Sequence, residues 1–165
     1  MSDNWNAHTE QALEIIPKGA FLTVQHEEKR NTMTIGWGSF GFAWGKPIFT
    51  VMVRPSRYTY DLIEKSGEFT VSLPTTEAMK QALVLCGTKS GRDINKFDAA
   101  GITTIPGQNI STPIINCTGI HYECKIVYKQ PMSPDSLDAK LQSACYPASD
   151  YHTLYYGEIL AVYQK

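Results

Sequence analysis

The 165-residue sequence has no excess of charge of either sign. Lysine and arginine contribute 15 residues, aspartate and glutamate contribute 16, and the pI is near 6.4. A protein that binds nucleic acid or an anionic membrane through its overall field carries a marked positive excess. The composition therefore predicts no nucleic acid and no membrane as partner, and any anionic ligand has to be held by a local group of residues.

Long apolar runs and a secretion signal are also missing. No stretch approaches the ~20 apolar residues that span a bilayer. The N-terminal sequence MSDNWNAHTEQALEII has acidic residues and an amphipathic turn, where a signal peptide has basic residues and an apolar run. These features predict a cytoplasmic protein.

The four cysteines form neither a Cys-x-x-Cys pair nor a disulfide framework. Cys86, Cys117, Cys124 and Cys145 are expected to be free thiols in a reducing compartment. Cys117, His121 and Cys124 are close enough in sequence to suggest zinc. However, a strand directs His121 and Cys124 to opposite faces, and no second group of ligands follows. The sequence predicts no metal.

Two phosphate-binding motifs and the usual catalytic groupings are absent as well. There is no G-x-x-x-x-G-K-[ST] P-loop and no G-x-G-x-x-G dinucleotide motif. No triad or carboxylate pair indicates a side-chain nucleophile or general base. No repeat, low-complexity tract or linker divides the chain, so residues 1–165 are expected to form a single domain.

What the sequence does contain is many short strands. Runs rich in β-branched and aromatic residues predict strands at 20–25, 31–40, 48–53, 69–73, 102–105, 114–117, 120–128 and 154–163. Helices are predicted at 9–15, from Ser56 to Gly67, at 75–86 and briefly before Gly101. Because steps from strand to strand dominate, the pattern favours a mainly β, antiparallel barrel with a few helices outside it over a doubly wound parallel sheet.

The segment TVMVRPSRYTYDLIEKSG (50–67) has the residue types that hold a phosphate. Pro55 ends the predicted strand, and Gly67 is placed for a left-handed helix cap. A strand that turns into a helix here gathers two guanidinium groups and two hydroxyls beside the free N–H groups of the helix start. These side chains belong to Arg54, Arg57, Ser56 and Thr59. The two arginines could equally be solvated turn charges, and the serine only a helix cap.

Two further stretches are candidates for a ligand site. Gly36 and Gly38 leave space above the backbone for a flat molecule, although a barrel corner or bulge with Trp37 packed in the core explains them equally well. The loop TKSGRDINKF (88–97) is a second cluster of hydroxyl, guanidinium and ammonium groups, which by itself is typical of a charged surface loop.

Four sequence blocks together resemble the flavin reductase-like proteins, in particular the flavoredoxin branch. They are NTMTIGWG (31–38), VRPSRYT (53–59), SGRDINKF (90–97) and DYHTLYYGEI (150–159), and they occur in the family's order over nearly the whole chain. The resemblance implies an antiparallel split β-barrel that binds FMN and forms a homodimer, with the flavin in a groove at or near the subunit interface.

The resemblance also implies roles for individual residues. The strand that meets the isoalloxazine edge, partly through backbone groups, would contain Asn31, Thr32, Met33 and Thr34, with Trp37 and Ser39 close by. The cradle for the ribityl phosphate would consist of Arg54, Ser56, Arg57, Tyr58 and Thr59. The loop that folds over the ligand would contribute Ser90, Arg92 and Lys96. His152 and Tyr155 would face the ring or an incoming nicotinamide. The chain departs from the family at Asn95, where aspartate is common, and residues 130–146 match no pattern of the family.

Two functional classes follow from this interpretation. The first is an NAD(P)H-dependent FMN reductase, in which NADH or NADPH stacks on the open ring face and delivers hydride to flavin N5. The second is a non-catalytic electron carrier of the flavoredoxin type, which exchanges electrons with a redox protein partner. A small β-barrel that binds another phosphate compound is a third possibility. An accessible stacking face favours the enzyme, and a covered ring favours the carrier.

Overall fold

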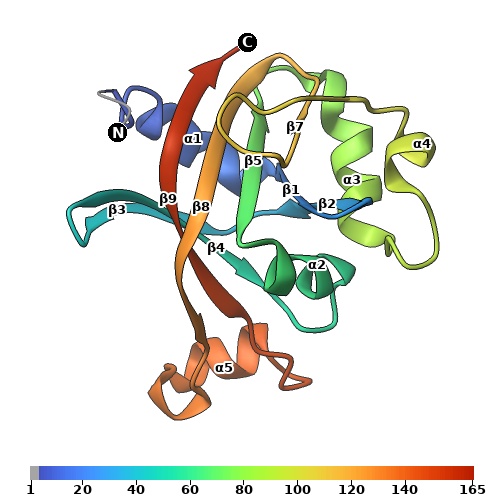
Figure 1. Cartoon of the computed structure of the whole chain (residues 1–165). Coiled ribbons are helices and arrows are strands. Elements are labelled where there is room, and N and C mark those ends of the chain that lie inside the picture. Colours follow the sequence, from blue (N-terminus) through green and yellow to red (C-terminus); the bar gives the residue numbers. More distant parts are fainter. Residues whose placement is uncertain (1–3) are drawn as a thin grey trace.

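The fold is built around one seven-stranded sheet that curls into a barrel (Figure 1). The computed structural model describes residues 4–165. The strands of the sheet are β1 (Ala20–His26), β2 (Lys29–Ile35), β3 (Gly38–Ala43), β4 (Lys46–Val53), β5 (Glu68–Pro74), β8 (Gly119–Pro131) and β9 (Thr153–Gln164). Their order is β2-β1-β5-β8-β9-β4-β3, and every neighbouring pair is antiparallel. Because β2 and β3 are unpaired edges, the barrel is split, and the predicted fold class is confirmed.

Short helices and one small strand pair complete the fold. The helices are α1 (Thr9–Ile15), α2 (Tyr58–Ser66), α3 (Lys80–Thr88), α4 (Lys96–Ala100) and α5 (Ala139–Cys145), with 3₁₀ turns η1 (Ile16–Lys18), η2 (Glu77–Met79) and η3 (Pro134–Ser136). The short strands β6 (Thr104–Ile105) and β7 (Ile114–Ile115) pair with each other. Gly67 ends α2 in the left-handed conformation, as predicted, and Gly101 ends α4 in the same conformation. Among residues 4–165, no helix is long and apolar enough to cross a membrane.

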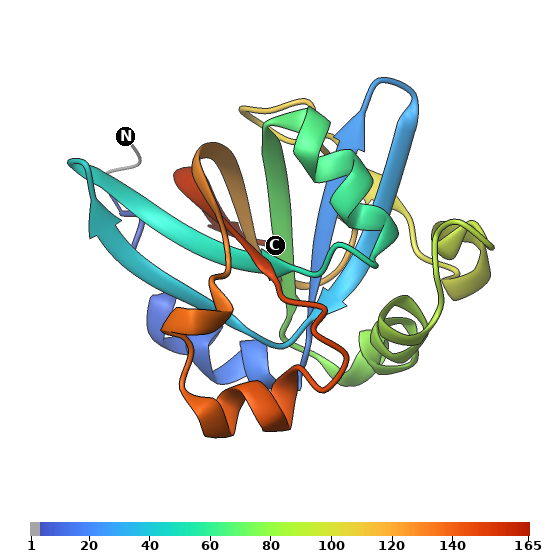
Figure 2. The ribbon, with the colours of Figure 1, turned by 90° about the horizontal axis from the view of Figure 1, so that it is seen from below.

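Apolar side chains pack on both faces of the sheet. Leu22 of β1 faces the barrel interior, where Leu62 and Ile63 of α2 join the core. The preceding residue, Phe21, faces outward into a second cluster with Cys86 of α3, since successive strand side chains alternate. As a result, α2 packs against β1 and β2 inside the opening, whereas α3 and α4 lie outside the same strands (Figure 2).

The strand material predicted at 31–40, which two glycines interrupt, divides into two separate strands. The chain leaves the sheet at Gly36 and Trp37, so that β2 and β3 lie at opposite edges. Gly38 begins β3 against β4, where a β-carbon would stand 3.0 Å from the Phe49 ring. The glycine therefore serves a close barrel crossing. Of the two alternatives for this stretch, the one that packs Trp37 in the core is wrong, because 47% of its surface is exposed.

Other predicted boundaries also shift. The helix expected at 75–86 begins as η2 and continues as α3 to Thr88, so Gly87 lies inside the helix. The strands expected at 102–105 and 114–117 shrink to two residues each. Residues 130–151, expected to be a loop, contain α5, which Asp138 caps by accepting the N–H groups of Lys140 and Leu141.

Candidate functional site

Two hollows in the surface meet beside the N-terminus of α2. The first, called the α2 hollow, is lined by Asn31, Met33, Ser56, Arg57, Tyr58, Thr59, Thr88, Lys89, Ser90, Gly91 and Lys96. The second, called the Trp37 hollow, is lined by Met33, Thr34, Ile35, Gly36, Trp37, Met52, Arg54, Arg57 and His152. Met33 and Arg57 line both hollows. The two hollows are therefore neighbouring parts of one groove.

The start of α2 presents free N–H groups to the α2 hollow. After Pro55 the chain turns, with the N–H of Arg57 donating to the carbonyl of Arg54 at 3.0 Å. Among the described residues, the N-cap Arg57 gives no side-chain hydrogen bond to the first turn, so the expectation that Ser56 caps the helix is wrong. The first N–H groups of a helix have no partner within the helix, and together they attract an anion.

Arg57 joins the two walls of the α2 hollow. Its Nη1 donates to the carbonyl oxygen of Gly87, in the last turn of α3, at 3.1 Å. A guanidinium group has five N–H donors, so this contact leaves others for a ligand. The floor is fixed by Asn31 of β2, which donates to the hydroxyl of Thr59 at 2.9 Å. Arg57 therefore combines a defined position with unused donors.

Gly91 closes the loop 88–95 over this floor. A β-carbon at position 91 would lie 2.2 Å from Oδ1 of Asn31 and 2.7 Å from the Tyr58 ring. Only glycine fits such a close approach. Sequence reasoning did not single out Gly91, although a glycine between Ser90 and Arg92 was the available signal. It also did not single out Thr88, Lys89 and Met52, which have no distinctive pattern.

Lys96 places a buried ammonium group at the α2 hollow. The side chain is 3% exposed, and Nζ donates to the carbonyls of Thr32 and Cys86 at 3.0 and 2.8 Å. Burial lowers the pKa of Lys96 to about 8, the nearby Cys86 opposes this shift, and the charge of Arg57 adds to it. The group is thus a cation at neutral pH and loses its charge in mildly alkaline solution.

The rings of Trp37 and His152 form one flat wall of the Trp37 hollow, which Arg54 and Arg57 also line. The half-exposed ring of Trp37 lies 5.3 Å from that of His152, measured between centroids. Burial and the charge of Arg54 lower the pKa of His152 to about 4, against the opposing charge of Asp150. His152 is therefore neutral at pH 7, and the wall formed by the Trp37 and His152 rings suits a planar group.

Arg54 occupies a different place from the one implied for a phosphate ligand. Its guanidinium donates to the carbonyls of Asp150 and Cys145 at 2.8 and 2.9 Å, and it lies 4.8 Å from the centre of the Tyr146 ring. Arg54 thus fastens the connection between β8 and β9 beside the Trp37 hollow. The hydroxyl of Ser56 lines the α2 hollow but donates to the carboxylate of Asp150.

Two β-strand residues implied for the site do not line either hollow with their side chains. The hydroxyl of Thr32 lies on the outer face of the sheet, the face of Phe21, where it accepts from Thr23 and donates to the carbonyl of Leu22. Only the backbone carbonyl of Thr32 reaches toward the site, through Lys96. Ser39 is exposed on β3 opposite Thr50, away from both hollows. Alternation along the strands explains Thr32, and the break at residues 36–37 explains Ser39.

Arg92 and Tyr155 also lie outside the two hollows. Arg92 pairs with the carboxylate of Asp61 at 2.7 Å and lies over the ring of Tyr58, which places it on the outer rim. Tyr155 is fully buried in the barrel, and its hydroxyl donates to Glu64 at 2.6 Å. The expectation that Tyr155 faces a ligand is therefore wrong. It packs inside because its position in β9 points toward the core.

The cysteines and His121 offer no second reactive site. All four cysteines are free, as predicted. Burial raises the pKa of Cys117 to about 11, so its thiol stays protonated. The ring nitrogens of His121 contact the Ser72 hydroxyl and the carbonyl of Cys117. Within residues 4–165, no group of three His, Cys, Asp or Glu side chains is arranged to hold a metal ion.

The groove fits the two chemically different ends of a flavin mononucleotide. Hydroxyls, cations and helix N–H groups suit a phosphate dianion, and the close approach at Gly91 shapes that end. The Trp37 hollow, with the rings of Trp37 and His152 on one wall, suits a planar ring. The fold and groove together define a split β-barrel with a candidate site for a phosphate compound that carries a flat ring. The chain belongs to the family of the flavin reductase like domain, whose family model matches residues 16–165.

Several proteins resemble this chain in sequence or in fold. An uncharacterized protein of Archaeoglobus fulgidus is 31% identical over 90% of this chain and 73% of its own. A flavoredoxin from Methanosarcina acetivorans has a TM-score of 0.69 and 26% identity, over 89% of this chain and 69% of its own. An FMN-binding protein from Thermus thermophilus has the same fold, with a TM-score of 0.69 and 24% identity over 88% of this chain and 69% of its own.

Proposed function

We propose that the chain binds FMN, with the phosphate in the α2 hollow and the isoalloxazine ring in the Trp37 hollow. The observation that carries this proposal is that Met33 and Arg57 line both hollows. One ligand with an anionic end and a flat end can therefore use both. The FMN-binding name of the Thermus thermophilus neighbour supports the same ligand.

Different residues bind the phosphate and the ring. Arg57 and the N–H groups of Tyr58 and Thr59 hold the phosphate, Ser90 adds a hydroxyl, and Lys96 adds positive charge from below. Trp37, Met33 and the backbone of residues 34–36 border the ring. Bound FMN would supply the redox chemistry, and the chain would supply position and charge.

Titration of the purified protein with FMN, riboflavin and AMP tests this proposal. Flavin fluorescence is followed for the first two ligands, and AMP is added as a competitor. We expect micromolar or tighter binding of FMN, weaker binding of riboflavin, and little competition by AMP. Failure to bind FMN at micromolar concentration would refute the proposal, and strong AMP binding would favour another phosphate ligand.

We further propose that the protein is an NAD(P)H-dependent flavin reductase. The half-exposed ring of Trp37 and the neutral imidazole of His152 give a second planar molecule a flat surface to contact. A non-catalytic electron carrier is the second candidate, which the similarity to a flavoredoxin favours. Anaerobic stopped-flow mixing of the FMN-loaded protein with NADH or NADPH distinguishes them. Rapid bleaching of the flavin is expected for a reductase, and no bleaching with either nucleotide indicates a carrier.

We also propose a homodimer in a reducing, cytoplasmic compartment. The β3–β4 hairpin projects from the barrel (Figure 1) and carries Phe42 and Trp44, each 61% exposed. Trp44 lies near Tyr128 and Tyr156, with ring centroids at 5.7 and 6.0 Å. Such an exposed aromatic cluster is typical of an interface. Sedimentation should give a dimer for the wild type and a shift to monomer for Trp44→Asp. A monomeric wild type would refute this proposal.

A further inference from the structure

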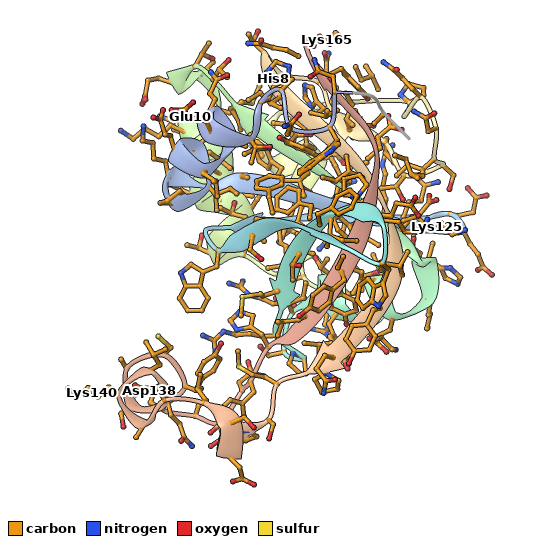
Figure 3. All side chains as sticks on the ribbon, turned by 90° about the vertical axis from the view of Figure 1, so that its left-hand side faces the viewer. His8, Glu10, Lys125, Asp138, Lys140 and Lys165 are labelled. Atoms are coloured by element: carbon orange, nitrogen blue, oxygen red, sulfur yellow. The ribbon has the colours of Figure 1, made fainter. Side chains whose placement is uncertain are left out.

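The connection between β8 and β9 forms one border of the Trp37 hollow. It spans residues 132–152 and is closed at its base by the N–H of Met132, which donates to the carbonyl of His152 at 3.0 Å. Its helix α5 lies at the end of the barrel (Figure 2). Asp138 and Lys140, at the start of α5, lie on the side away from the barrel (Figure 3). The opposite end of the connection, from Tyr146 to His152, is the part that reaches the hollow.

Tyr146 is the residue of this connection that contacts His152. Its hydroxyl lies 2.6 Å from Nδ1 of His152, and the two rings meet edge to face with centroids 5.5 Å apart. Tyr146 is 5% exposed and His152 is 9% exposed. The tyrosine ring is itself held by the guanidinium of Arg54 at 4.8 Å and by the stacked ring of Tyr151 at 5.0 Å. The contact is therefore fixed from several sides.

The hydrogen-bond inventory around this pair determines the position of the imidazole proton. If Nδ1 of His152 carried the proton, the Tyr146 hydroxyl would accept it, and its own proton would have no acceptor within residues 4–165. A buried donor without a partner costs about 1–3 kcal/mol. In the alternative arrangement, the Tyr146 hydroxyl donates its proton to an unprotonated Nδ1, and the imidazole proton is on Nε2. This arrangement leaves no buried donor of the pair without an acceptor.

Nε2 is then the group that His152 offers to a ligand. His152 lines the Trp37 hollow, and its Nε2 has no hydrogen-bond partner among the described residues. We propose that Tyr146 is a positioning residue that fixes His152 as the Nε2–H tautomer, so that His152 donates a hydrogen bond to a neutral carbonyl or carboxamide oxygen of the second substrate. That this second substrate is a nicotinamide nucleotide rests on the proposed flavin reductase function.

The neutral state of the donor limits which substrates it favours. Because His152 is uncharged at pH 7, it gives no long-range attraction for a carboxylate. A neutral donor in a partly buried hollow instead raises the affinity for a substrate with an oxygen at the right position, and the affinity for an analogue that lacks this oxygen is lower. The carboxamide of a nicotinamide has the required acceptor and the planar shape.

Nitrogen NMR of the histidine rings tests the tautomer without any flavin. The chain has four histidines, and the His152→Gln variant assigns the His152 signals. In ¹⁵N-histidine-labelled protein at pH 7, His152 should show a protonated Nε2 and an unprotonated Nδ1. Tyr146→Phe keeps the ring contacts and should give a mixture of tautomers, whereas Tyr151→Phe should not, since its hydroxyl accepts from Gln142. A protonated Nδ1 in the wild type, or an unchanged tautomer in Tyr146→Phe, would overturn the proposal.

Steady-state and binding measurements test the effect on the second substrate. Tyr146→Phe should raise KM for NADH or NADPH about threefold or more and leave Kd for FMN within about twofold, and Tyr151→Phe should change neither. Unchanged KM in Tyr146→Phe would overturn the role in substrate binding. Failure of the wild type to bind FMN would instead refute the proposed function. The tautomer measurement needs no flavin, so it tests the role of Tyr146 separately from the proposed function.

Discussion

Gly91 passes Asn31 so closely that a β-carbon at position 91 would lie 2.2 Å from the side-chain oxygen of Asn31. This approach brings the loop 88–95 onto β2 and forms one wall of the α2 hollow. Asn31 cannot easily move away, because its amide nitrogen donates to the buried hydroxyl of Thr59. The shape of the hollow therefore depends on the absence of a side chain at position 91.

The variant Gly91→Ala tests this dependence. The added methyl group has to displace the loop, so we expect FMN to bind at least tenfold more weakly, a loss of about 1.4 kcal/mol or more. Gly41→Ala is the matched control, since a β-carbon at position 41 meets no atom within 4 Å. Fluorescence titration of both variants measures the effect. Equal FMN affinity in Gly91→Ala and the wild type would show that the loop does not contribute to the site.

The buried Lys96 predicts a pH dependence of FMN binding. Its pKa is about 8 in the free protein, and Cys86 and Arg57 are the neighbouring groups that shift it besides burial. A bound phosphate dianion favours the ammonium form, so binding takes up a proton once Lys96 has begun to lose it. Kd for FMN should therefore be lowest near pH 7 and rise progressively as the pH passes through about 8. Riboflavin should show no such rise.

Lys96→Met provides the control for this pH profile. The variant should bind FMN more weakly at pH 7 and should lack the rise in Kd above pH 8. A rise of the same size in the variant would assign the titration to another group. Circular dichroism at both pH values shows whether the fold is retained.

Tyr155 predicts a change in stability without a change in binding. Its buried hydroxyl donates to Glu64, and it lines neither hollow. Tyr155→Phe should lower the free energy of unfolding by about 1–2 kcal/mol and leave FMN affinity unchanged. Tyr128→Phe is the exposed counterpart and should alter stability by less than about 0.5 kcal/mol. Denaturant unfolding and flavin titration give both quantities. A loss of FMN affinity in Tyr155→Phe without a loss of stability would show that Tyr155 belongs to the FMN site.

Local sequence signals predicted the elements that depend on local chemistry. Gly67 and Gly101 mark helix ends because both adopt a left-handed conformation, and the antiparallel barrel followed from the frequent strand-to-strand steps. The helix α5 was missed although Asp138 is a capping residue, because prolines lie on both sides of the segment. A barrel corner at Gly36 and Gly38 was one of two alternatives, but the separation of β2 from β3 was not predicted, because residues on both sides have strand character.

The assignment of side chains to the two hollows could not be predicted from sequence. Arg54 and Arg57 are the same residue type and lie three positions apart, so the sequence does not distinguish them. In the structure, the turn at Pro55 and the connection 132–152 direct Arg54 to the carbonyls of Cys145 and Asp150. Arg57 instead reaches Gly87 across the α2 hollow. Both outcomes depend on contacts between segments 30 or more residues apart. Only a three-dimensional structure shows such contacts.

The difference between these two arginines provides the most direct test of FMN binding. FMN and riboflavin share the ring and differ in the phosphate, so their Kd values are compared in the wild type, Arg57→Ala and Arg54→Ala. Loss of a charge-assisted hydrogen bond costs about 1.5–3 kcal/mol, or about 10- to 100-fold in Kd. Arg57→Ala should weaken FMN by this amount and change riboflavin little, whereas Arg54→Ala should affect the two ligands equally. Equal losses for both ligands in Arg57→Ala would contradict the placement of the phosphate in the α2 hollow.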